Sequence, residues 1–242
     1  MAFGTDPRVA RMGGRVAVDQ VDVGLRRYML SIYNYMGLGL ALTGIVALLV
    51  ASSPALYEPI LFSPLKWVVM LAPLGFVMFL SFRVQQMSTS AVQATFWAFC
   101  AVMGLSMASI FLVFTGASIA RTFFVTAAAF GALSLYGYTT KRDLSAFATF
   151  LVVGLFGLII ASVVNIFIGS TAIQFAVSVA GVLIFAGLTA WDTQRLKEMY
   201  YEAMEPGAQT KMAVMGALSL YLNFINMFQF LLQFMGVRTS ND

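Results

Sequence analysis

The chain has 242 residues, of which 60% are hydrophobic, 10% are charged and none is histidine. A soluble domain carries about a quarter of its residues as Asp, Glu, Lys and Arg, so this composition excludes an ordinary soluble protein and predicts an integral membrane protein. The lack of histidine also excludes Ser–His hydrolysis, histidine zinc sites and histidine-based pH sensing. Cys100 is the only cysteine, which excludes an intramolecular disulfide.

The N-terminal part of the chain is polar and basic. Residues 1–31 include five arginines, and the apolar run Ile32–Ala51 that follows has the length of about 20 residues that a bilayer-spanning helix needs. The apolar core of a signal peptide would be shorter, about 7–15 residues. We therefore predict an Arg-rich segment over residues 1–31, followed by a first span that is not cleaved.

Six further apolar runs follow, separated by helix breakers. Three prolines mark a first loop over residues 54–64, and Gly169–Ser170 and Pro206–Gly207 mark the last two turns. The sequence thus predicts an all-α membrane protein, with seven transmembrane helices over residues 32–235 and a short tail over residues 236–242. The further predicted spans are Leu65–Phe82, Ala91–Phe114, Ser118–Tyr138, Ser145–Ile168, Thr171–Trp191 and Met212–Met235.

The basic residues predict the orientation of the spans. A cytoplasmic N-terminus would place eleven basic residues on the cytoplasmic side and three on the other. Since cytoplasmic loops carry the excess of Lys and Arg, we predict a cytoplasmic N-terminus and an external C-terminus. The eleven are Arg8, Arg11, Arg15, Arg26, Arg27, Arg83, Lys141, Arg142, Arg195, Lys197 and Lys211, and the three are Lys66, Arg121 and Arg238.

Asp192 lies at the end of the sixth span, after an uncharged stretch over residues 175–190. An ionisable group at membrane depth is by default a functional candidate. Asp192 and Asn223 lie at nearly equal distances from the turn at Pro206–Gly207, so antiparallel helices rising about 1.5 Å per residue would make them neighbours. Alternatively, Asp192 lies near the cytoplasmic interface in an ordinary solvated pair with Arg195.

The seventh span carries a polar stripe. Its polar residues follow steps of four, three, three and four, which places them on one helical face about 120° wide. An unsatisfied amide in hydrocarbon costs several kcal/mol, so the stripe must face protein or water and the seventh helix is expected at the centre of the bundle. The stripe either faces a pore or makes hydrogen bonds between helices. Its members are Ser219, Asn223, Asn226, Gln229 and Gln233.

Two other polar residues lie near the external side. Asn165, near the end of the fifth span, either faces the pore or caps the helix end. Glu58, in the first loop, is either at a cation entrance or a solvated loop residue. No enzyme, cofactor or nucleic-acid partner is predicted. A retinal Schiff base, for example, would need a lysine within the last span, and Lys211 lies at its edge.

Three segments together resemble the bacterial transmembrane Bax-inhibitor family, and the resemblance covers nearly the whole chain beyond the Arg-rich segment. It implies seven spans in the bacterial inner membrane and a calcium leak that is governed by pH. The segments are "ALSLYGYTTKRDLS" at Ala132–Ser145, "WDTQRLKEMY" at Trp191–Tyr200 and "ALSLYLNFINMFQFLL" at Ala217–Leu232.

The resemblance also implies roles for particular residues. In the family, two aspartates on the sixth and seventh spans share a proton and sense pH, and an arginine from the second span can latch the pore. Asp192 matches the first aspartate, within "DTQ", and Arg83 is the basic residue placed to match the latch. The family pattern Leu-Tyr-Leu-Asp-Phe-Ile-Asn has its aspartate where this chain has Asn223.

The missing second aspartate changes what the site is expected to do. Two carboxylates in contact cannot both ionise cheaply, and an Asp–Asn pair lacks this source of pH sensitivity. We therefore expect a weakened or acid-shifted pH response, and weak calcium binding at Asp192, because calcium prefers several oxygen ligands. The leading hypothesis is a leak of calcium or other cations gated around Asp192. The alternative is a non-conducting protein that binds other membrane proteins in stress response or quality control.

Overall fold

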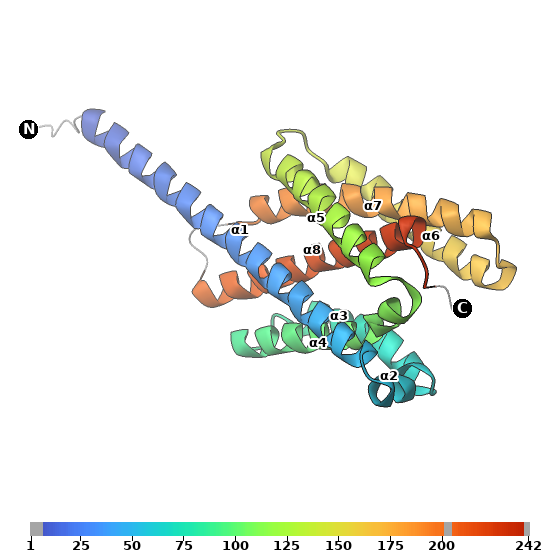
Figure 1. Cartoon of the computed structure of the whole chain (residues 1–242). Coiled ribbons are helices and arrows are strands. Elements are labelled where there is room, and N and C mark those ends of the chain that lie inside the picture. The colour runs from blue at the N-terminus through green and yellow to red at the C-terminus, as the bar shows by residue number, and fades with distance from the viewer. Residues whose placement is uncertain (1–6, 201–204, 240–242) are drawn as a thin grey trace, which may run out of the picture.

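The computed structural model describes residues 7–200 and 205–239, with side chains from Val23 onward. Seven helices in this part of the chain are long and apolar enough to cross a membrane, and the shorter α2 lies between the first two of them (Figure 1). The predicted all-α architecture with seven membrane spans is therefore confirmed. The helices are α1 (Pro7–Ala51), α2 (Pro54–Leu61), α3 (Leu65–Arg83), α4 (Thr89–Val113), α5 (Gly116–Thr139), α6 (Ser145–Ile168), α7 (Thr171–Glu198) and α8 (Pro206–Met235).

The helices and the apolar runs share their positions but not all of their boundaries. α7 continues beyond the predicted Trp191 to Glu198, and α8 begins at Pro206 rather than Met212. α1 begins at Pro7, so the boundary predicted at residue 31 is not a helix boundary. The reason is that backbone hydrogen bonding continues as long as good helix formers follow, whether or not the side chains are apolar.

The first loop also differs from its prediction. Its prolines indicated irregular structure, but Pro54–Leu61 forms the helix α2. Pro54 occupies the start of this helix, where a residue without an N–H is tolerated because the first amides of a helix have no intrahelical partner. A proline is therefore a start signal here and not a breaker.

The turns between spans are stabilised by local hydrogen bonds that the sequence encodes. The hydroxyls of Ser88, Thr115 and Ser170 each accept the backbone N–H three residues ahead, which satisfies an orphan amide at the start of α4, α5 and α7. Gly169 ends α6 with a φ of 67°, a left-handed conformation that glycine adopts without steric cost. The turn predicted at Gly169–Ser170 is present.

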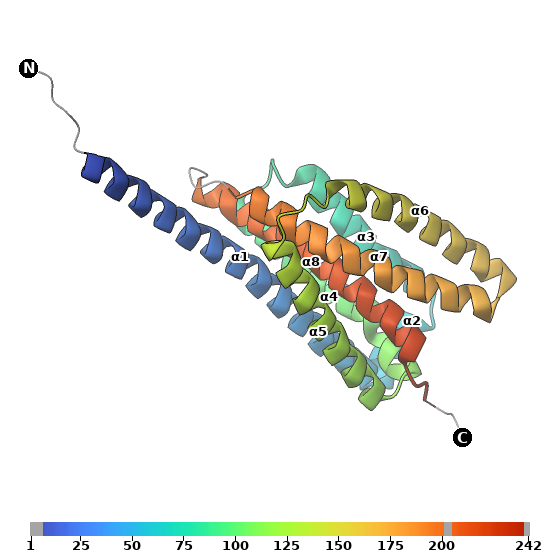
Figure 2. The same ribbon diagram turned by 90° about the horizontal axis from the view of Figure 1, so that it is seen from above.

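Helix α8 is the central element of the bundle. In the most apolar 18-residue stretch of α8, 61% of the residues are buried, whereas the corresponding stretches of the other six spans are 11–33% buried. α8 packs against α1, α4, α5 and α7, which surround it in both views (Figures 1 and 2). The central position predicted from its polar stripe is confirmed.

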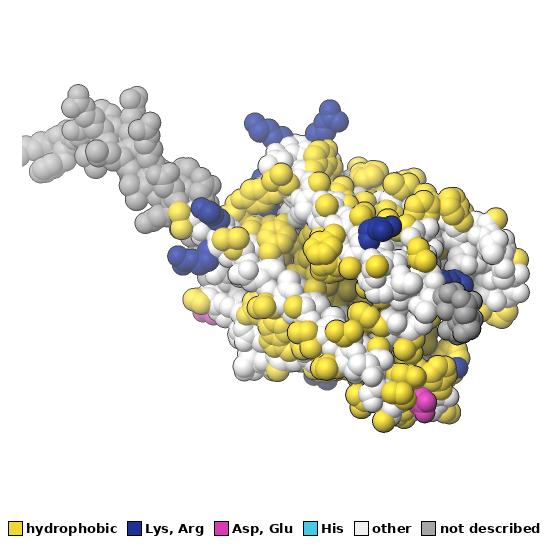
Figure 3. Space-filling view, viewed as in Figure 1, with side chains coloured by type: hydrophobic (Ala, Val, Ile, Leu, Met, Phe, Trp, Pro, Cys, Tyr) yellow, Lys and Arg dark blue, Asp and Glu magenta, His cyan; other side chains and the backbone are white. Residues whose placement is uncertain are grey.

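The peripheral helices expose apolar side chains. α3 packs on α4, and α6 packs on α7, so that each has a broad outward face covered by large hydrophobic residues. Such faces suit a hydrocarbon solvent. Hydrophobic side chains cover much of the surface in Figure 3, while the charged ones are few.

The two ends of the bundle differ in charge. We call the end where α3, α5 and α7 finish the basic end, because it carries Arg83, Lys141, Arg142, Lys197 and Lys211. The opposite end, where α2 lies, is called the α2 end. There the C-terminal segment returns to the turn between α4 and α5. The N–H of Thr115 donates to the Val237 carbonyl over 3.0 Å, and the N–H of Thr239 donates to the Val113 carbonyl over 2.9 Å.

Candidate functional site

Asp192 is a buried carboxylate at the contact between α7 and α8. Only 5% of the residue is exposed. Its Oδ2 accepts a hydrogen bond from Ser219 Oγ over 2.8 Å and a second from Asn223 Nδ2 over 2.7 Å. Ser219 and Asn223 are one helical turn apart on α8, so both side chains reach the same oxygen. The contact between Asp192 and Asn223 that the hairpin register predicted is confirmed.

The other carboxylate oxygen lies next to a basic residue of the same helix. Arg195 Nη2 is 3.8 Å from Asp192 Oδ1, and the Arg195 guanidinium lies over the Trp191 ring, 4.9 Å from its centroid. The Arg195 side chain is 45% exposed, whereas that of Asp192 is 7% exposed. The pair with Arg195 therefore exists, but the aspartate in it is buried rather than solvated.

The structure does not bring Arg83 to this carboxylate. Arg83 is exposed at the end of α3, and its Nη1 donates to Gln86 Oε1 over 3.0 Å. α3 packs mainly on α4. Among the described side chains, Arg195 is the basic partner of Asp192, and the latch role of Arg83 stays a prediction.

The residue after Asp192 joins three helices, and sequence reasoning missed it. Thr193 is fully buried, and its hydroxyl lies 3.0 Å from that of Ser134 on α5. Ser134 is hydrogen-bonded in turn to the Tyr33 hydroxyl on α1. This chain of hydroxyls ties α1, α5 and α7 together directly beside the candidate site.

Gln194, the third residue of the "DTQ" motif, holds the turn between α5 and α6. Its Nε2 donates to the carbonyl of Arg142 over 2.8 Å, and its Oε1 accepts the N–H of Leu144 over 3.0 Å. Because successive helical residues are rotated by about 100°, three consecutive polar residues face three different neighbours. That spacing was the available signal for Thr193 and Gln194.

Two cavities meet beside Asp192. The first, of about 910 Å³, opens at the basic end between α3, α4, α7 and α8, and Arg195, Glu205 and Lys211 contribute its charged lining. The second, of about 560 Å³, lies between α6, α7 and α8, and its polar lining includes Asn223 and Asn226. Ser219 and Leu222 line both cavities. These two residues therefore form the partition between them, and Ser219 joins that partition to the buried carboxylate.

The polar stripe of α8 divides into two parts. Ser219 and Asn223 bind Asp192, and Asn226 lines the second cavity while its amide donates to the Leu222 carbonyl over 2.8 Å. Gln229 is half-buried, and Gln233 lies exposed near the α2 end, where its Oε1 accepts the Ser178 hydroxyl over 3.4 Å. The first part of the stripe faces the cavities, and its last member makes contact between helices.

Asn165 and Glu58 lie away from these cavities. Asn165 Oδ1 accepts the backbone N–H of Ser170 over 3.0 Å, so this side chain caps the turn between α6 and α7. Glu58 is exposed on α2. In the described ranges no three His, Cys, Asp or Glu side chains gather into a metal-binding group. A cation at Asp192 would thus meet one carboxylate together with neutral oxygens.

Comparison with known proteins agrees with this architecture. Residues 25–240 match the family described as "Inhibitor of apoptosis-promoting Bax1". An uncharacterized protein of Caulobacter vibrioides is 48% identical over 229 residues, which cover 89% of this chain and 90% of the relative. The protein RP147 of Rickettsia prowazekii is 45% identical over 217 residues, with 90% and 92% covered.

A third relative carries a more informative name. The inner membrane protein YbhL of Escherichia coli K12 is 44% identical over 226 residues, which cover 92% of this chain and 96% of the relative. The family match spans all seven membrane helices, including the segments that hold Asp192 and Asn223. The chain is a multi-pass membrane protein that belongs to the Bax inhibitor-like family.

Proposed function

We propose that the protein is a leak pathway for calcium or other cations, gated around Asp192. One observation carries the proposal: a buried carboxylate binds Ser219, which lies at the partition between a cavity that opens at the basic end and a second cavity along α8. A carboxylate in hydrocarbon is costly and is retained where it serves ions or protons. Asp192 provides the negative charge that a dehydrating cation needs as it passes the partition.

The partition explains how such a pathway would be closed. Leu222 contributes apolar surface to both cavities, and an apolar constriction resists the passage of water and ions. Arg195 adds a positive charge 3.8 Å from the carboxylate. Opening would require α8 to move relative to α7 so that Ser219 and Asp192 face one continuous path.

The pathway would lie in the inner (plasma) membrane of a bacterium. The relative YbhL is named an inner membrane protein. The excess of basic residues on the side of the N-terminus supports a cytoplasmic N-terminus, and the basic end of the bundle would then face the cytoplasm. The cavity of about 910 Å³ would open to the cytoplasm.

Calcium flux into liposomes that contain the purified protein tests this function. We expect Asp192→Asn to lower the flux at least about tenfold, the factor that corresponds to about 1.4 kcal/mol. Asn223→Asp restores a pair of carboxylates, so its flux should depend on pH more steeply than that of the wild type. Asp143→Asn, a change of an exposed acid in the turn before α6, is the matched control and should conduct like the wild type.

The alternative is a non-conducting protein that binds other membrane proteins. The apolar partition at Leu222 favours it, because the two cavities are separate in this conformation. The same liposomes distinguish the two functions. Flux no greater than that of empty liposomes, for every variant at acid, neutral and alkaline pH, would refute the leak and leave the binding role.

A further inference from the structure

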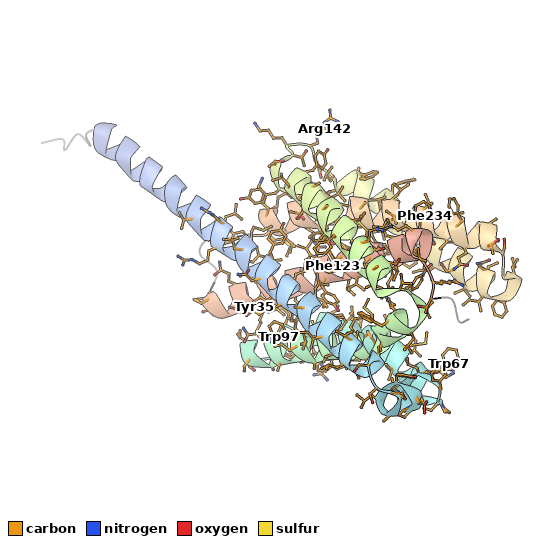
Figure 4. The ribbon with its side chains drawn as sticks, viewed as in Figure 1. Tyr35, Trp67, Trp97, Phe123, Arg142 and Phe234 are labelled. Carbon is orange, nitrogen blue, oxygen red and sulfur yellow. The ribbon has the colours of Figure 1, made fainter. Side chains whose placement is uncertain are left out.

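A groove separates α1 from α5 on the face shown in Figure 3. It has a volume of about 710 Å³, and its walls are apolar side chains of both helices. Phe224 of α8 lies at its floor. The rings of Phe123 and Phe130 each lie 5.6 Å from that of Phe224, so three aromatic side chains form one apolar surface. Figure 4 shows Phe123 between α1 and α5.

The groove is long enough to hold an acyl chain through the apolar depth of one membrane leaflet. On α1 its lining extends from Arg26 to Leu40, and on α5 from Tyr138 to Phe123. At 1.5 Å per residue each stretch spans about 21 Å. One leaflet contributes about 15 Å, half of a hydrocarbon core of about 30 Å, so an extended acyl chain fits along the groove.

The charge at one end of the groove is positive. Arg26 lines the groove at the basic end and is exposed. Arg27 follows it on α1, and the turn after α5 contributes exposed Lys141 and Arg142. The acid of that turn, Asp143, has its Oδ1 engaged by the N–H of Ser145 over 2.8 Å. Among the side chains that the structure describes, an anion at the mouth of the groove would therefore meet mainly basic ones.

We propose that this groove is a binding site for an anionic phospholipid. One acyl chain lies along α1 and α5 against Phe224, and the phosphate lies at Arg26. Basic pockets between membrane helices at one bilayer surface are typical sites for anionic headgroups. This proposal does not depend on whether the protein conducts cations. It would nevertheless place a lipid against Phe224, the residue after Asn223 on α8, and beside the hydroxyl chain that begins at Tyr33.

The test uses the full chain, purified in detergent and incubated with equal amounts of phosphatidylglycerol and phosphatidylcholine. Native mass spectrometry measures which lipids stay bound. The wild type should retain phosphatidylglycerol about fivefold more than phosphatidylcholine, as expected for one basic contact near the membrane surface. Arg26→Ala should lose this preference, and Arg121→Ala should keep it, because Arg121 is exposed near the start of α5, at the α2 end, and does not line the groove.

A second pair of variants tests the acyl chain. A Cβ added at Gly131, in the groove, or at Gly157, on the outer face of α6, meets no atom within 4 Å. Gly131→Phe should therefore fold and fill the groove, lowering the retention of both lipids at least fivefold, whereas Gly157→Phe should retain them. Thermal unfolding confirms that each variant is folded. If Gly131→Phe does not fold, the comparison of Arg26→Ala with its arginine control variant tests the proposal by itself.

Four results would overturn the proposal. Equal retention of the two lipids by the wild type would remove the headgroup site, and so would equal behaviour of Arg26→Ala and Arg121→Ala. Full lipid retention by a folded Gly131→Phe would show that the groove does not hold the acyl chain. A lipid-free dimer crosslinked between α1 and α5 would show that a second copy of the chain occupies the groove instead.

Discussion

α5 and α7 approach each other closely at Gly137, and replacing this residue tests the packing beside Asp192. A Cβ at Gly137 would lie 2.1 Å from the carbonyl oxygen of Ala190 and 2.8 Å from its carbonyl carbon. Ordinary contact begins at 3.4 Å, so Gly137→Ala must move the two helices apart by roughly 1.3 Å. The atoms that the new Cβ would meet belong to the Ala190 backbone, so no side-chain rotation can relieve the contact. Small residues that let helices approach closely are typical of membrane bundles.

We expect Gly137→Ala to destabilise the protein by about 1–3 kcal/mol, the usual range for overpacking. Gly131→Ala is the matched control on the same helix, where an added Cβ meets no atom within 4 Å. That variant should be stabilised by about 0.5–1 kcal/mol, because alanine has less backbone freedom to lose than glycine. The two substitutions are chemically identical, so opposite signs can only come from the packing.

Thermal or denaturant unfolding in one detergent, followed by circular dichroism, measures both variants against the wild type. Because Ala190 lies two residues before Asp192, Gly137→Ala should also alter calcium flux if the leak exists. Equal stability of Gly137→Ala and Gly131→Ala would refute the reasoning, since it would mean that α5 and α7 are not in contact at Gly137.

Three further predictions follow from hydrogen bonds. Ser219→Ala removes a hydrogen-bond donor from the buried Asp192 carboxyl and should lower the free energy of unfolding by about 1–3 kcal/mol, because a buried oxygen loses one of its partners. Gln194→Ala frees the basic turn between α5 and α6, so limited trypsin digestion should cut that turn faster. The N–H of Ser145 holds the pKa of Asp143 below its ordinary value of 3.8. Asp143→Ala should therefore be less stable than the wild type above about pH 4, and the difference should vanish as the pH falls through the lowered pKa.

The first two of these predictions have control variants, and the third is checked by its pH dependence. Ser162 donates to a carbonyl of its own helix, and Gln229 is half-buried on α8 outside both cavities, so alanine at either position should leave unfolding and tryptic cleavage nearly unchanged. If Ser219→Ala unfolds like Ser162→Ala, the Asp192 contact does not stabilise the bundle. If the Asp143→Ala difference persists at low pH, its cause is not the ionised carboxylate.

Much of the fold could be predicted from the sequence, because a bilayer permits few backbone structures. Every backbone polar group in hydrocarbon must be paired within its own segment, so each apolar run of sufficient length had to be a helix. Hydrocarbon also excludes polar side chains, so the polar stripe of α8 had to face protein, and this predicted a central position for α8. Equal distances from one turn put Asp192 beside Asn223, since helical rise is constant. The family resemblance, carried by the same segments, is borne out by the match over residues 25–240.

The tertiary structure alone decided which neighbours complete the site. Sequence spacing could not show that α3 packs on α4 and leaves Arg83 bonded to Gln86, nor that Asp192 is buried in its pair with Arg195. It could not show that Ser219 joins Asn223 at one oxygen of the carboxylate, or that two cavities meet there. These features depend on the rotation and separation of helices distant in the chain. Side-chain packing sets both quantities, and hydropathy along the sequence does not record either one.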